Sequence, residues 1–202
     1  MHIVIIVGSH RSKSESSRVG AYVARDLARI APDASVDTLD LAGNPLPLWD
    51  ESLWQGGSPL AAQWKPIRDR LRKADAFVIV SPEWAGMVPP GLKNLLLFAG
   101  PKEVGHKPAL IVTVSASRGG SYPVNELRTS GYKNNRLLHI PEHVLVHDVG
   151  DVLQGDTPAD ERDAWLRRRI DFALRILLEY SKALTSVRAT GLIEHADFPY
   201  GM

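Results

Sequence analysis

Three short loops hold most of the residues that could bind a charged ligand. The first, residues 8–17, reads Gly-Ser-His-Arg-Ser-Lys-Ser-Glu-Ser-Ser and leads into a segment with helical periodicity. Hydroxyls and backbone N–H groups at a helix amino end favour a dianionic phosphate, and Arg11 would add charge-assisted hydrogen bonds of roughly 1.5–3 kcal/mol each. The loop therefore has the parts of a phosphate site; the alternative is a polar loop whose serines cap a helix.

The other two loops each follow a short apolar run. Residues 81–86, Ser-Pro-Glu-Trp-Ala-Gly, follow the run 76–80, and residues 115–120, Ser-Ala-Ser-Arg-Gly-Gly, follow the run 109–114. Such runs are typical of strands covered on both faces in a parallel sheet. The repeated order of strand and then polar loop predicts that the three loops meet at one edge of that sheet.

Several other chemistries lack their motifs. No Walker lysine follows a glycine pair and no Gly-x-Gly-x-x-Gly occurs, so a nucleotide P-loop or a dinucleotide fingerprint is not supported. Ser9 or Ser115 as a hydrolase nucleophile would need a Gly-x-Ser-x-Gly elbow, which is absent. We expect no catalytic side chain of that kind.

A histidine series also invites a metal-site interpretation. His139, His143 and His147 recur at every fourth residue, which on a helix would form a metal-binding face. Pro141 and the Val-Leu-Val run at 144–146 instead predict a strand. We therefore expect no metal site.

Composition narrows the class of protein. Lysine plus arginine (24) nearly balance aspartate plus glutamate (23), which gives no reason to expect nucleic acid or an anionic membrane as a partner. The absence of cysteine excludes disulfides, cysteine-ligated metals and thiol nucleophiles, so redox chemistry would need a cofactor. The apolar run at 2–8 is too short to cross a bilayer and has no basic leader, so we expect a cytoplasmic protein.

The elements that must position the loops alternate along the chain. Strands are predicted at 2–8, 35–41, 76–80, 109–114 and 143–147, and helices at 19–30, 60–71, 92–99, 124–128 and 157–184. Thr157 is the expected cap of the last helix, with Pro158 at its first position. Five strands alternating with helices predict an α/β fold, a three-layer doubly wound parallel sheet. We expect one domain over 1–202, with 185–202 a tail without a firm element.

The motifs resemble those of the NAD(P)H-dependent FMN reductases, a family of flavodoxin-like fold that includes azo, chromate and quinone reductases. Its opening signature, Gly-Ser-x-Arg-x-x-Ser-x-Asn or Ser, is matched by Gly8, Ser9, Arg11, Ser14 and Ser16. Its second signature is matched by Pro82, Glu83, Pro89, Leu92, Lys93 and Asn94. Trp84 stands where the family has tyrosine, Ala85 where it has asparagine and Pro90 where it has glycine. The loop 115–120 is similar to the family's second ring-contacting loop.

The resemblance implies strand order 2-1-3-4-5, a bound flavin mononucleotide (FMN), and NADPH or NADH as electron donor. FMN would carry the chemistry without a catalytic side chain, reducing a quinone, free flavin, azo compound or metal oxyanion by ping-pong hydride transfer. Its phosphate would lie on the first loop and its ring against the other two. The expected cofactor-binding residues are Ser9, Arg11, Ser14, Ser16, Ser17, Pro82, Glu83, Trp84, Ala85, Gly86, Ser115, Ser117, Arg118, Gly119 and Gly120.

Two other functions remain as alternatives, and the sequence also predicts an oligomer. A flavodoxin-type electron carrier is disfavoured because such carriers are strongly acidic, and a non-catalytic regulatory protein is the second alternative. The helix predicted at 92–99 contains Leu92, Leu95, Leu96, Leu97 and Phe98, too apolar a set for one sheet face to cover, unless it is a fully buried core helix. We therefore expect a homodimer or a dimer of dimers, a homotetramer, with the partner subunit walling the flavin site.

Overall fold

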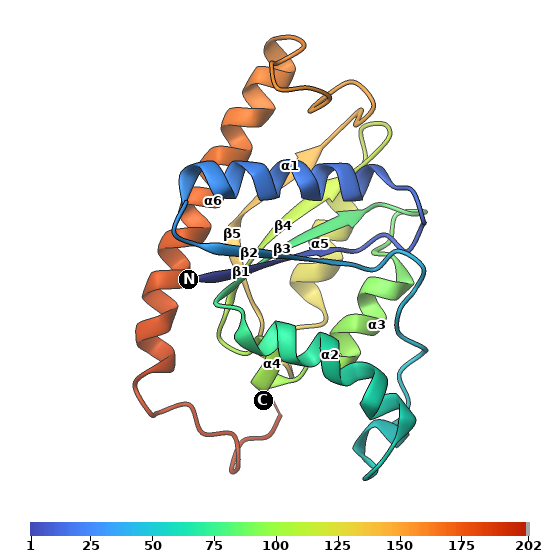
Figure 1. Cartoon of the computed structure of the whole chain (residues 1–202), viewed down its shortest axis with the longest axis vertical. Helices are drawn as coiled ribbons and strands as arrows, with labels where there is room; N and C mark the ends of the chain where they lie inside the picture. Colours follow the sequence, from blue (N-terminus) through green and yellow to red (C-terminus); the bar gives the residue numbers. More distant parts are fainter. Residues whose placement is uncertain (201–202) are drawn as a thin grey trace.

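The computed structural model describes residues 1–200 and contains a five-stranded parallel sheet in the order β2-β1-β3-β4-β5 (Figure 1). The strands are β1 (His2–Val7), β2 (Ser35–Asp40), β3 (Ala76–Pro82), β4 (Pro108–Val114) and β5 (Leu138–Val146). β1 pairs with β2 on one side and β3 on the other, so the strand order reverses beside it. The predicted fold class and strand order are confirmed.

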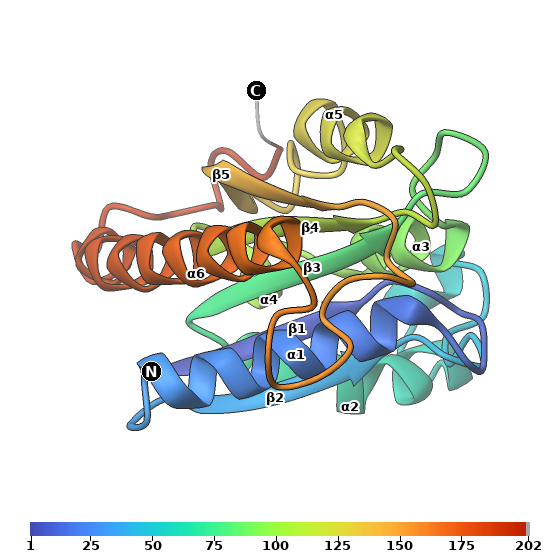
Figure 2. The same cartoon turned by 90° about the horizontal axis from the view of Figure 1, so that it is seen from above.

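Helices cover both faces of the sheet (Figure 2). The helices are α1 (Glu15–Ile30), α2 (Pro59–Lys73), α3 (Pro90–Phe98), α4 (Pro101–Val104), α5 (Ser121–Thr129) and α6 (Glu161–Arg188), with a 3-10 turn at Glu51–Trp54. α1 and α6 pack on one face, and the remaining α-helices pack on the other. Two separate apolar cores result, one on each side of the sheet, as the unbroken burial of β1, β3 and β4 requires.

The last helix differs from its prediction at both ends. Asp160, not Thr157, is its cap, and the Asp160 carboxylate accepts from the backbone N–H of Asp163 at 2.7 Å. The helix also continues to Arg188, past the predicted start of the tail. Threonine and aspartate are both common helix caps, so residue type does not distinguish Thr157 from Asp160, and the path of the preceding loop decides between them.

β5 begins at Leu138, earlier than the predicted residue 143, and it is an edge strand with β4 as its single neighbour. Pro141 lies inside it, next to an irregularity in register between Ala109 and Ile111 of β4. Proline is tolerated there because it lacks an N–H and an edge strand leaves one side unpaired. Among residues 1–200, every helix falls short of the length and apolar character that crossing a bilayer would demand.

Two glycines bring the first loop close to the sheet. A Cβ atom at Gly20 would lie 2.8 Å from Val7 Cγ2, so α1 packs against β1 more closely than a larger residue would allow. At Gly8 a Cβ atom would lie 2.7 Å from Leu92 Cδ2. The amino end of α1 is therefore fixed just beyond the carboxyl end of β1.

Candidate cofactor site

A cavity of about 180 Å³ lies where the carboxyl ends of the strands meet the amino end of α1. It is lined by Ser9, Arg11, Ser14, Glu15, Ser16, Pro82, Glu83, Trp84, Val114, Ala116 and Val149. Segments that follow β1, β3, β4 and β5 thus share one cavity, as expected at a switch in strand order.

The first loop presents hydroxyls and a guanidinium to this cavity. Ser9 and Ser16 are buried, each about 1% exposed, whereas Arg11 is exposed and free to move onto a ligand. Ser14 caps α1 by accepting from the backbone N–H of Ser17 at 3.1 Å. The helix-cap interpretation of the loop is therefore confirmed, and the phosphate-site interpretation is compatible with it because the capped helix end is also a site of positive potential.

Ser17 has a structural role that the sequence did not indicate. Its hydroxyl donates to the Asp40 carboxylate at 2.8 Å, at the end of β2, and lies 2.9 Å from Ser14 Oγ. This contact fixes the first turn of α1 to the neighbouring strand. It also leaves the Ser17 hydroxyl proton engaged away from the cavity.

Glu83 joins the second loop, residues 81–86, to the third loop, residues 115–120. Its backbone N–H donates to Val114 O at 3.0 Å, and its carboxylate accepts from the backbone N–H of Gly120. Gly120 has a φ of 119°, a conformation that favours glycine, and a Cβ atom at Gly119 would lie 2.8 Å from Glu83 Oε1. The two glycines thus let the third loop pass close over the carboxylate.

Trp84 is held in a tight turn beside the cavity. Trp84 and Met87 exchange backbone hydrogen bonds of 3.1 and 2.9 Å, and the two residues between them, Ala85 and Gly86, have φ values of 50° and 74°. This pair of left-handed residues defines a type I′ turn. The Trp84 indole meets the His10 ring edge to face, with ring centroids 4.6 Å apart. The turn therefore places an aromatic side chain at the rim of the cavity.

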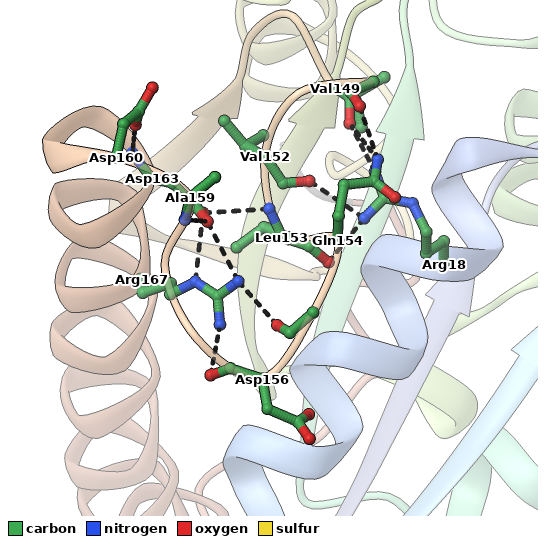
Figure 3. A network of polar contacts seen from close by, with 12 residues as sticks. Arg18, Val149, Val152, Leu153, Gln154, Asp156, Ala159, Asp160, Asp163 and Arg167 are labelled. Atoms are coloured by element: carbon green, nitrogen blue, oxygen red, sulfur yellow. Dashed lines mark hydrogen bonds and ion pairs between the residues drawn. The ribbon is translucent and has the colours of Figure 1, made fainter.

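A polar network fixes the loop after β5 against α1 (Figure 3). The guanidinium of Arg18 donates to the carbonyls of Val149, Val152 and Leu153. From the other side, the buried Asp163 accepts from the N–H of Leu153 at 3.0 Å and pairs with Arg167. The contacts of this network seat Val149 in the cavity wall.

The charge of Asp163 is maintained by its partners. Burial acts to raise the pKa of this carboxyl, but hydrogen bonds from Arg167 and from the backbone N–H groups of Ala159 and Leu153 hold it below its usual value. An ionised Asp163 is a strong acceptor for each of these donors. The loop that carries Val149 is therefore anchored by a charge-assisted network.

The cavity contains some of the predicted residues and not others. Those that line it are Ser9, Arg11, Ser14, Ser16, Pro82, Glu83 and Trp84. Those nearby but outside its lining are Ser17, Ala85, Gly86, Ser115, Ser117, Arg118, Gly119 and Gly120. The sequence interpretation missed Glu15, Val114, Ala116 and Val149. A signal for Val149 was available, since every parallel strand of the sheet ends at this edge.

Two motif residues serve the fold rather than the cavity. The Asn94 amide donates to Pro47 O at 2.7 Å and accepts from the backbone N–H of Trp49 at 2.9 Å, so it fixes the connection after β2. Lys93 pairs with Glu126 of α5, whose carboxylate also accepts from the N–H of Val88. Within residues 1–200, no group of three metal-ligating side chains is present.

The residues present fit the phosphate end of FMN. Serine hydroxyls, the Arg11 guanidinium and the amino end of α1 form a donor set suited to a dianion. The cavity is smaller than the roughly 300–1,000 Å³ of pockets that enclose whole ligands. It would therefore hold the phosphate end, with the ring lying across the outer loops.

Comparison with known proteins identifies the family to which the chain belongs. Residues 1–151 match the family model of the NADPH-dependent FMN reductases. The chain is 29% identical over 187 residues to a probable NADPH:quinone oxidoreductase 1 of Oryza sativa, covering 91% of this chain and 93% of that protein. It is 30% identical over 188 residues to a 2-hydroxy-1,4-benzoquinone reductase of a Burkholderia species, covering 84% and 98% respectively.

Solved structures agree on the fold. The flavoenzyme FerB of Paracoccus denitrificans, an NAD(P)H:acceptor oxidoreductase, superimposes with a TM-score of 0.70 at 18% identity, over 89% of this chain and 98% of that one. The chain belongs to the NADPH-dependent FMN reductase family. It is an oxidoreductase of the NAD(P)H-dependent FMN reductase type, and the resemblance drawn from its motifs is confirmed.

Proposed function

We propose that this protein binds FMN at the cavity beside α1 and uses NADPH or NADH to reduce a small flat acceptor, with quinones as the preferred class. The observation that carries the proposal is the meeting of the Ser9 to Ser16 loop with the Glu83 and Ala116 loops in one cavity at the strand ends. Quinone as the acceptor rests on the two relatives described above, both of which are named for quinone reduction.

The protein's own contribution is orientation. Bound FMN would supply the redox chemistry, accepting a hydride from the nicotinamide and passing it to the acceptor. Ser9, Ser14 and Arg11 would hold the phosphate, and Glu83 would keep the second and third loops in register beneath the ring. Trp84, braced by His10, would border the place where nicotinamide and acceptor enter.

One open ring face implies alternate binding. In the proposed arrangement the three loops would contact the phosphate, one edge and one face of the flavin, so donor and acceptor would share the remaining face. Reciprocal plots against NADPH at several quinone concentrations should then be parallel, and anaerobic NADPH alone should bleach the bound flavin. Converging lines would refute the shared face. A flavin that stays oxidised with NADPH and NADH would instead favour the non-catalytic alternative.

Arg11 provides the direct test of the phosphate site. Replacing Arg11 by alanine should weaken FMN binding ten- to a hundredfold, the loss expected when charge-assisted hydrogen bonding worth roughly 1.5–3 kcal/mol in total is removed. Lys13→Ala is the matched control, because it removes the same charge from the same loop at a residue that does not line the cavity. Equal FMN affinity of Arg11→Ala and wild type, measured by flavin fluorescence, would show that the phosphate lies elsewhere.

We also propose that a second copy of the chain covers the α3 face. Three residues of α3 named in the sequence interpretation, Leu92, Leu95 and Phe98, are buried in the core, whereas Leu97 is 65% exposed. Leu97 borders a cavity of about 580 Å³ whose lining also includes Trp54, which is 74% exposed. Leu97 also lines a second cavity together with Val88, which follows the half-exposed Met87 of the Trp84 turn. This continuity favours a partner subunit that completes the shallow site.

Light scattering tests the assembly. Wild type at micromolar concentration should have the mass of a dimer or tetramer, and Leu97→Glu should dissociate it. Phe172→Glu is the control, because Phe172 is also half-exposed but lies on α6, on the opposite face of the sheet. A monomeric wild type would reject the proposal, as would dissociation by Phe172→Glu alone.

A further inference from the structure

A second, basic pocket lies at the opposite edge of the sheet from the FMN loops. Its volume is about 250 Å³, and it is formed where the carboxyl ends of α2 and α6 meet the turn between α4 and β4. Figure 1 shows the segment after α6 running beneath this edge towards α4. The lining residues are Arg72, Pro101, Lys102, Gly105, His106, Lys107, Arg188, Ile193 and His195.

The lining carries cations and no carboxylate. Arg72 pairs with Glu103 at 2.8 Å and Arg188 lies 3.6 Å from Asp75, so these two cations have acidic neighbours behind the wall. Lys107 is buried and donates to three backbone carbonyls, those of Leu71, Arg72 and Glu103. Carbonyl oxygens bind the ammonium group but do not neutralise it. The pocket therefore retains net positive charge.

Lys102 is the most adaptable of the lining cations. Its side chain is exposed, and within residues 1–200 it makes no ion pair. A flexible lysine at a pocket rim can turn onto a bound anion without giving up an existing partner. An anion could therefore bind Lys102 without breaking an ion pair that stabilises the fold.

Two imidazoles complete the wall. The rings of His106 and His195 stack with centroids 5.7 Å apart and planes at 11°. His106 Nε2 is buried without a hydrogen-bond partner among the described residues, and His106 has a φ of 54°, rarely adopted by a residue with a side chain. Burial, and then the positive charges of His195, Arg136 and Arg188, lower the pKa of His106. An anion in the pocket could accept a hydrogen bond from protonated His106 Nε2 and would offset the surrounding positive charges.

We infer that this pocket binds a small phosphate-type anion, such as pyrophosphate or the phosphate group of a small phosphorylated molecule. The volume lies below the roughly 300–1,000 Å³ of pockets that enclose drug-sized ligands, which excludes a whole dinucleotide from the interior. Charged N–H donors converging from several elements suit the many acceptor oxygens of phosphate.

Binding would also fix the carboxyl-terminal segment to the body of the protein. Ile193 and His195 follow the end of α6, whereas Lys102 and Arg72 belong to α4 and α2. An anion that contacts both groups links them directly. Susceptibility of residues 189–200 to proteases should therefore fall when the pocket is filled.

Calorimetric titration of the FMN-loaded protein with inorganic pyrophosphate at low ionic strength tests the inference, with inorganic phosphate and sulfate as smaller probes. One pyrophosphate should bind per chain, more tightly than either smaller anion. Lys102→Gln should weaken that binding about tenfold, as expected for one lost charge-assisted contact, and His195→Gln should also weaken it. Lys73→Gln is the matched control, since Lys73 lies at the same end of α2 but outside the lining.

The variants separate this pocket from the FMN site. Arg11→Ala should keep its pyrophosphate affinity even where FMN binding is weakened. Absence of saturable binding to wild type would overturn the inference, and so would equal weakening by Lys73→Gln and Lys102→Gln, which would indicate general charge attraction. Loss of pyrophosphate binding in Arg11→Ala alone would place the anion in the FMN cavity instead.

Discussion

The Glu83 carboxylate accepts a hydrogen bond from the Gly120 N–H, and we expect this contact, called the brace below, to hold the second and third loops together. Glu83→Gln keeps the shape of the side chain but replaces a charged acceptor with a neutral one. A hydrogen bond to a charged group contributes roughly 1.5–3 kcal/mol and one between neutral groups roughly 0.5–1.5 kcal/mol. The variant should therefore lose about 1–1.5 kcal/mol at this contact.

The loss should appear in two measurements. The free energy of unfolding in urea should fall by about 1 kcal/mol. FMN affinity should fall about five- to tenfold, because part of the binding free energy would then be used to order the third loop. Gly119→Ala tests the same brace from the other side, since its Cβ atom would lie 2.8 Å from Glu83 Oε1. Glu179→Gln is the control for removing one carboxylate, because Glu179 is exposed on α6 and far from the loops.

A brace that organises both loops requires stability and FMN affinity to fall together in Glu83→Gln. If Glu83→Gln matches wild type in both stability and FMN affinity, the brace does not organise the loops. If stability falls while FMN affinity is unchanged, the brace supports the fold alone and the third loop does not contact the flavin. Glu179→Gln should leave FMN affinity as it is in wild type.

Three further outcomes can be checked by denaturation. Ala85→Gly should raise the free energy of unfolding by about 0.5–1 kcal/mol, because relief of the left-handed φ of 50° outweighs the added freedom of the unfolded chain; an unchanged or lower value would contradict the type I′ turn. Gly20→Ala should lower it by about 1–3 kcal/mol through the clash with Val7, whereas a neutral result would mean that α1 can move away from β1. Burial, and then the charge of Arg128, lower the pKa of His139 to about 4, below its unfolded value near 6.5. The folded state then binds fewer protons between these values, so wild type should lose about 2 kcal/mol from pH 7 to pH 5, and His139→Leu should show a shallower dependence.

Much of the fold was determined by local pattern. The apolar runs that became β1, β3 and β4 are buried at nearly every residue. Such continuous apolar runs are typical of parallel strands that are covered by helices on both faces. Strand order followed from the resemblance, and the position of the loops followed from the rule that parallel strands end at one edge. Seven of the eleven cavity-lining residues were predicted on this basis.

Boundaries in the last third of the chain were less predictable. Thr157 and Asp160 are both good helix caps by residue type, and the choice between them depends on where the preceding loop is anchored. Asp163 anchors that loop by accepting from the backbone N–H of Leu153, a contact across ten residues of irregular chain. Local propensity contains no information about such a contact, so the prediction at Thr157 was wrong.

The sequence by itself determined the class of fold, the family and the positions of the three loops, because apolar runs and glycine-rich turns are local patterns of residue type. Only the tertiary structure decided which side chains of those loops hold the fold together. The Ser17 hydroxyl donates to the Asp40 carboxylate, and the Glu83 carboxylate accepts from the Gly120 N–H. The tertiary structure also alone assembled the basic pocket, where Lys102 and His195 lie 93 residues apart in the sequence but line one space. Both results depend on how distant elements pack, and packing distance cannot be read from the spacing of residues along the chain.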